Sequence, residues 1–132
     1  MRATDLRIGN YVRYLNKLAK VRQIRSNKIL LKSIGIPQIV YVDYIEPIEI
    51  TEEILLKCGF EKATIPTAIK DIFIVYYKKD SFVVYLMNDF FEIELITKDG
   101  EQFNLFRTFK KELHILQNIY QLLENQELTI NL

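Results

Sequence analysis

The chain has 132 residues, with 49% hydrophobic and 27% charged side chains and a formal net charge of +1. This length suits one domain or two very small ones, and the 8 Tyr and 8 Phe with few Gly and Pro exclude a disordered or collagen-like chain. A single Cys excludes an intramolecular disulfide, and no apolar run reaches the roughly 18 residues of a membrane span. The N-terminus lacks the pattern of a secretory leader. We therefore expect a soluble cytoplasmic protein without membrane contact.

The charges are distributed unevenly along the chain. Residues 1–46 contain nine Lys and Arg against three Asp and Glu, a net charge of +6. Residues 47–132 contain nine basic and fourteen acidic side chains, a net charge of −5. A basic lobe can attract nucleic acid or an acidic protein surface, and solvation alone also accounts for such a lobe.

Short runs of β-forming residues fill the first part of the chain. These runs are 8–14, 18–24, 28–34 and 38–44, and the turn signals between them include Ser26-Asn27 and Gly35-Ile36-Pro37. In the second run, apolar and basic residues alternate, which indicates one buried and one wet face. We therefore predict a basic β-rich module over residues 1–50, folded as a small SH3-like β-barrel or a bent sheet. Such modules are more often binding domains than enzymes.

A short helix is predicted to link this module to the next. Thr51 is a suitable N-cap, and Glu52 and Glu53 would occupy the positive end of the helix dipole. Gly59 provides the expected stop. Cys58 lies on the short apolar stripe, where a buried hydrophobic side chain is a better interpretation than a nucleophile.

Four strands are predicted after this helix, at 72–77, 82–87, 90–96 and 102–109, and they favour an antiparallel meander. Asp99-Gly100 is the strongest turn signal and predicts a type I′ hairpin with positive φ at both residues. The first two strands are apolar on both faces, so we expect them at the centre of the sheet or under a helix.

The last predicted element is a helix over residues 110–124. Its apolar residues recur at three- and four-residue spacings and would cover the meander. Asn125 is expected to end it in the left-handed conformation, and Leu128, Ile130 and Leu132 alternate like a strand that could add to a sheet edge. The fold class is therefore α+β, with a second module over residues 51–132 packed on the first.

Candidates for catalysis are few. Glu92 and Glu94 share a strand face and could pair for acid/base chemistry or bind a divalent ion, but a solvated face explains them better. His114 lies beside the apolar stripe of the last helix, where a surface or partly buried imidazole is expected. Known nucleotide, zinc and nucleophile motifs are absent from the sequence, so we predict no catalytic residue, metal or cofactor and a protein that is not an enzyme.

Basic and aromatic side chains are interleaved in the first module, and we predict that they form a binding surface. Stacking on tyrosine rings and contacts from cations to phosphates or carboxylates would both be available there. The candidate partner-binding residues are Tyr11, Arg13, Tyr14, Lys20, Arg22, Arg25 and Lys28.

Three stretches carry a family resemblance: LRIGNYV at Leu6–Val12, EPIEITEEILLKCGFEK at Glu46–Lys62, and LHILQNIYQLLENQELTI at Leu113–Ile130. They resemble a family of short uncharacterised proteins from bacteriophages and mobile elements, whose ending reads like HxLQNLYxxLTGEEL. Asn125 stands where that family tends to have the capping Gly. The resemblance covers about a third of the chain and implies a phage or mobile-element origin, and it does not point to any particular activity.

Three functions therefore remain open. The first is an accessory protein that binds a host protein, such as a nuclease or a ribonucleoprotein, and acts as a counter-defence inhibitor of the anti-CRISPR kind. The second is a nucleic-acid-binding module that uses the basic lobe, although the sequence pI near 7.8 is low for this class. The third is an uncharacterised enzyme, which the lack of converging polar motifs disfavours.

Overall fold

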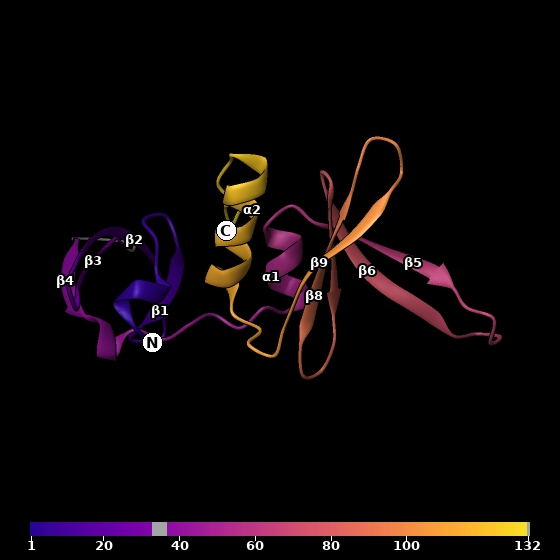
Figure 1. The fold of residues 1–132 in the computed structure, drawn as a ribbon. Coiled ribbons are helices and arrows are strands. Elements are labelled where there is room, and N and C mark those ends of the chain that lie inside the picture. The colour runs from indigo at the N-terminus through magenta and orange to yellow at the C-terminus, as the bar shows by residue number, and fades with distance from the viewer. Residues whose placement is uncertain (33–36, 132) are drawn as a thin grey trace. The chain divides into compact units, whose positions relative to one another are not determined.

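The computed structural model describes residues 1–32 and 37–131 and divides the chain into two compact units (Figure 1). Unit 1 consists of Met1–Glu49 and Glu112–Leu128, and unit 2 of Ile50–Lys111 and Thr129–Leu132. Two antiparallel sheets and a C-terminal helix make an α+β protein. None of the described helices is long and apolar enough to cross a membrane.

Unit 1 contains a four-stranded sheet whose strands follow the chain in order. Its strands are β1 (Tyr11–Tyr14), β2 (Lys17–Arg25), β3 (Lys28–Lys32) and β4 (Gln38–Tyr41). Short 3-10 helices precede and follow them, η1 (Ala3–Asp5) and η2 (Val42–Tyr44). The predicted turn at Ser26-Asn27 joins β2 to β3, whereas the predicted break at Gly35-Ile36 lies outside the described residues.

The inner face of this sheet packs with flanking residues into a hydrophobic cluster. The buried residues of this cluster are Leu6, Val12, Ala19, Val21, Ile29, Leu31, Val40, Val42 and Ile45. In the described strands β1 and β4 are the two edges of an open sheet. A single bridge between Arg13 and Glu46 brings the chain back to β1 without forming a strand pair there. The structure therefore agrees with the bent sheet and does not bear out the SH3-like barrel.

The C-terminal helix α2 (Leu113–Glu124) belongs to unit 1. Asn125 ends it with φ of 55°, as predicted. Gln117 is fully buried on α2, and its Oε1 accepts a hydrogen bond from the Tyr11 backbone N–H at 2.8 Å. The Gln117 amide donates to the carbonyls of Gly9 and Leu128. These bonds tie the helix to the start of β1, whereas the sequence had predicted the helix as the cover of the second sheet.

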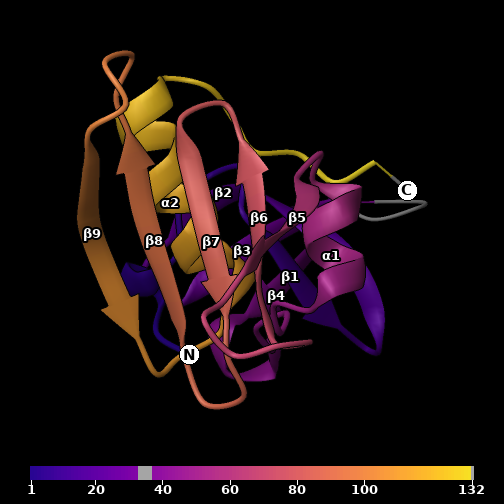
Figure 2. The same cartoon turned by 90° about the vertical axis from the view of Figure 1, so that its right-hand side faces the viewer.

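Unit 2 combines the short helix α1 (Glu52–Lys57) with a five-stranded antiparallel sheet. Its strands, in sheet order, are β5 (Glu61–Pro66), β6 (Phe73–Lys79), β7 (Phe82–Leu86), β8 (Phe91–Ile96) and β9 (Gln102–Thr108), as Figure 2 shows. The Thr51 hydroxyl accepts from the Ile54 N–H at 3.2 Å, which confirms the N-cap, and Gly59 follows the helix with φ of +91°.

Two details of unit 2 differ from the sequence predictions. The sequence did not predict β5, because it is a short edge strand that carries charges and ends in proline. The turn between β8 and β9 has positive φ at Gly100 and not at Asp99, so it is not type I′. The Thr97 N–H bonds to the Glu101 carbonyl around a longer loop, in which a single left-handed Gly suffices.

The C-terminal segment is not a strand over residues 126–131. Leu128 and Ile130 are buried, in keeping with their alternation, and the Asn131 N–H donates to the Lys57 carbonyl at 2.8 Å. Leu132 lies outside the described residues.

The predicted boundary near residue 50 coincides with a change of unit, but residues 112–128 return to the first unit. They bring acidic residues with them, so unit 1 holds nine basic and seven acidic side chains, a net charge of +2.

Candidate partner-binding surface

The outer face of β2, β3 and β4 gathers most of the predicted binding residues. A register shift between Val21 and Gln23 marks a β-bulge at Arg22. The extra residue changes the alternation, so that Arg22 and Gln23 are both exposed while Val21 remains in the core. We call the outward-facing set the basic face, which consists of Lys20, Arg22, Gln23, Arg25, Lys28, Leu30, Lys32, Ile39 and Tyr41.

Like charges stand directly opposite each other at two places on the basic face. Arg25 on β2 pairs in register with Lys28 on β3, and Lys20 pairs with Lys32. Such juxtapositions destabilise a sheet, because the two cations repel across neighbouring strands. Within the part of the chain that the structure describes, Arg22, Arg25, Lys28 and Lys32 have no ion-pair partner, whereas Arg7 is paired with Glu127.

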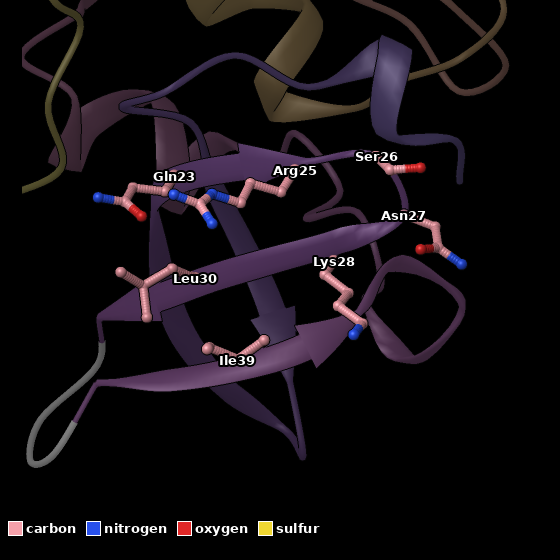
Figure 3. A pocket seen from close by; sticks show the side chains of 7 residues that line it. All are labelled: Gln23, Arg25, Ser26, Asn27, Lys28, Leu30 and Ile39. Carbon is pink, nitrogen blue, oxygen red and sulfur yellow. The ribbon is translucent and has the colours of Figure 1, made fainter.

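Apolar side chains lie between these cations. Leu30 stands between Gln23 on one side and Ile39 on the other, and Ile39 is 74% exposed. A pocket of about 610 Å³ opens here, and Figure 3 shows its lining residues, with the Arg25 side chain extending back toward Gln23. The lining residues are Gln23, Arg25, Ser26, Asn27, Lys28, Leu30 and Ile39.

Two tyrosines stand at opposite sides of this surface, Tyr41 within the basic face on β4 and Tyr11 beside it on β1. The Lys28 Nζ lies 5.6 Å from the centre of the Tyr41 ring, and the Lys20 Nζ lies 5.6 Å from that of Tyr11. Each lysine also stands opposite its tyrosine in the strand register. Contacts of this kind hold the ammonium groups over the rings while leaving them accessible to a partner.

Six of the seven predicted site residues lie on or beside the basic face, and one packs against the core. Lys20, Arg22, Arg25 and Lys28 lie on the basic face, with Tyr11 and the exposed Arg13 on the neighbouring edge strand β1. Tyr14 packs against the core of unit 1, so it does not supply an exposed ring. The apolar floor of Leu30 and Ile39 was not predicted, because residues 29, 30 and 31 are all apolar and the sequence alone does not show which of them face outward.

Each residue considered for catalysis is buried or engaged by a neighbour within its own unit. Glu92 is ion-paired with Arg107, and Glu94 accepts from the Tyr85 hydroxyl at 3.2 Å. His114 is buried at 2% exposure, deeper than expected, and belongs to unit 1 while both glutamates belong to unit 2. Among the described residues there is no group of three or more His, Cys, Asp and Glu side chains that could hold a metal ion.

Cys58 is buried, as its place on the apolar stripe predicted. Burial raises the pKa of its thiol to about 11, and the nearby Lys79 ammonium offsets only part of that rise. The Lys79 Nζ donates to the Cys58 carbonyl at 2.7 Å. A thiol with this pKa is a weak nucleophile near neutral pH.

No family model matches the chain, and no match was found among the curated proteins or the solved structures.

Proposed function

We propose that the chain is a non-enzymatic binding protein whose basic face docks on an acidic patch of a partner protein. The observation that carries this proposal is the pairing of Arg25 opposite Lys28 and of Lys20 opposite Lys32 around an apolar floor formed by the half-buried Leu30 and the exposed Ile39. The repulsion lowers the stability of the free sheet, and an acidic partner would relieve it.

The apolar floor favours a protein over a nucleic acid as the partner. Protein interfaces combine an apolar centre with a polar rim, and Leu30 and Ile39 occupy the centre of the basic face. Phosphate backbones offer carboxylate-like charge but little surface for an aliphatic side chain. The net charge of unit 1, +2, is also lower than is typical of a nucleic-acid-binding domain.

The resemblance to phage and mobile-element proteins guides the choice of partner. It supports a host protein, including a nuclease or a ribonucleoprotein, and an inhibitory role of the anti-CRISPR kind. Direct binding to nucleic acid is the second candidate, because Tyr11 and Tyr41 stand beside lysines on the same surface.

Affinity capture followed by reconstitution tests the proposal. Immobilised chain, treated with nuclease, is compared with the double variant Arg25→Glu, Lys28→Glu and with a matched control, Lys98→Glu, Lys110→Glu, which makes the same charge change at exposed positions of unit 2. We expect the captured protein, once purified, to bind the parent and control chains and to lose at least tenfold in affinity for the double variant.

Two results would contradict the docking of protein on this face. One is a purified partner that binds the double variant as tightly as the parent chain. The other is binding of a labelled oligonucleotide by the chain alone, with an affinity that falls steeply as salt increases, which would establish the nucleic-acid function instead.

A further inference from the structure

The hairpin of β5 and β6 extends beyond the rest of the unit 2 sheet. The two strands pair from Glu61 opposite Lys78 to Pro66 opposite Phe73, whereas the described pairing of β6 with β7 covers only Tyr77–Lys79. Residues 64–75 therefore form a two-stranded arm, visible at the right of Figure 1. Over residues 73–76, the edge of β6 that faces away from β5 has no strand partner among the described pairings.

The arm is apolar on both faces and exposed to solvent. Ile65 lies opposite Ile74 on one face, and Pro66 lies opposite Phe73 on the other. Six large apolar side chains are between 38% and 63% exposed: Ile65, Ile69, Ile72, Phe73, Ile74 and Val75.

This exposure contradicts the sequence pattern of β6. A strand that is apolar on both faces is normally buried on both, and the same pattern in β7 correctly predicted the burial of Phe82, Val83 and Val84. For residues 73–75 the prediction of burial is wrong for the single chain. Because an isolated two-stranded hairpin is only marginally stable in water, the arm has the composition of an element that is covered in an assembly.

We propose that the arm is a dimerisation element, in which the free edge of β6 pairs antiparallel with the same edge of a second copy. A two-fold axis at Ile74 would place Ile74 of one copy opposite Ile74 of the other and Phe73 opposite Val75. Two exposed hairpins would then become one continuous four-stranded ribbon.

Charge and edge chemistry favour a second copy as the occupant. The only charged residues of the arm are Lys70 and Asp71, which are adjacent and sum to zero, so two arms meet without repulsion. The edge strand β5 carries Glu61 and Lys62 and ends at Pro66, features that protect an edge from pairing. The β6 edge over residues 73–76 carries no charge or proline.

The arm also carries a large apolar patch. Its six exposed side chains present on the order of 600 Å² per chain, at the upper end of the largest patch on a typical monomer. Pairing along the β6 edge would cover the part of this surface next to the shared edge, and a patch of this size is typical of an interaction site.

Molar mass measured by sedimentation velocity from low to high micromolar concentration tests the proposal. We expect the parent chain to dimerise, and Ile74→Lys to stay monomeric because two ammonium groups would meet on the axis. Leu122→Lys is the matched control, since Leu122 is 78% exposed on α2, and it should dimerise like the parent. A parent chain that is monomeric throughout, or an Ile74→Lys dimer of unchanged affinity, would overturn the proposal.

Cross-linking provides a second test, which does not depend on a variant that disrupts the dimer. Ile74→Cys should form a disulfide-linked dimer on mild oxidation, whereas Leu122→Cys should not, and the buried Cys58 should not compete in either chain. Equal cross-linking of the two variants would mean random collision and would refute a specific pairing of β6 edges. Binding of a monomeric chain to lipid vesicles through the arm would also contradict the proposal, because a membrane surface and not a second copy would then cover the arm.

Discussion

Arg25 on β2 lies directly opposite Lys28 on β3, at the end of the hairpin that forms the pocket of the basic face. Two cations in this position repel each other, so the face is less stable than a sheet with opposite charges there. The proposed binding function would explain why such a pair is tolerated, because a surface optimised for a partner need not be optimal for folding.

Arg25→Glu should therefore stabilise the free chain while it weakens partner binding. An acidic side chain opposite Lys28 converts repulsion into attraction, and we expect the free energy of unfolding to rise by about 0.5 kcal/mol. Urea denaturation measures the change. Arg22→Glu makes the same charge change at the bulge, where the register gives no opposite residue, and should have a smaller effect. Equal stabilisation by both variants would indicate a general charge effect instead.

Gln117 should be one of the most sensitive positions in unit 1. Gln117→Leu removes one acceptor and two donors and leaves the Tyr11 N–H and two carbonyls without their bonds. We expect a loss of about 3 kcal/mol in the free energy of unfolding, because each buried polar group loses its partner. Gln121→Leu, one helical turn later, makes the same replacement at a half-buried position and should change stability by much less. Similar losses for both would show that the network contributes little.

Much of the fold was predictable because local signals agree with it. The strand periods, the Thr51 cap and the Asn125 stop all appear in the structure close to their predicted positions. These features depend only on residues that are neighbours in the chain, so they can be predicted from the sequence alone.

The remaining features depend on contacts between distant residues. The apolar stripe of α2 predicted a buried face but could not specify which sheet it covers, and the Gln117 bonds that fix it to β1 span more than a hundred residues. The charges of the basic face are visible in the sequence, whereas the outward position of Leu30 and Ile39 depends on how β3 and β4 pair. The arm was missed because β5 lacks a strong strand signal.

The turn between β1 and β2 contains a residue in an unfavourable conformation. Leu15 and Asn16 have φ values of +49° and +61°, the pattern of a type I′ turn that favours Asn and Gly. Leu15 is 73% exposed, so its side chain gains little from burial.

Leu15→Asn should stabilise unit 1 by about 1 kcal/mol, because asparagine tolerates the left-handed region better than leucine. Thermal and urea denaturation measure the effect. Leu15→Ala also removes the apolar side chain but keeps an ordinary Cβ at positive φ, and it should give no comparable gain. If alanine stabilises as much as asparagine, the exposed side chain and not the backbone is responsible.

Cys58 should make the stability of unit 2 depend on pH in the alkaline range. Burial raises the thiol pKa from 9.0 to about 11 in the folded chain. The unfolded chain therefore loses this proton at lower pH, so the contribution of Cys58 to stability is complete below pH 9 and is lost as pH rises through about 11. At full loss it amounts to about 3 kcal/mol. Urea denaturation across this range measures the change for the parent chain.

Cys58→Ala is the control, because it removes the thiol and keeps the Lys79 ammonium that donates to the carbonyl of residue 58. The parent should lose more stability than Cys58→Ala between pH 9 and 11, whereas parallel pH profiles would contradict a raised thiol pKa. Alkylation by iodoacetamide gives an independent measurement, since a thiol that is 1% exposed should react slowly until denaturant opens unit 2. Fast alkylation of the native chain would show that unit 2 opens locally and that the thiol is not held in a dry environment.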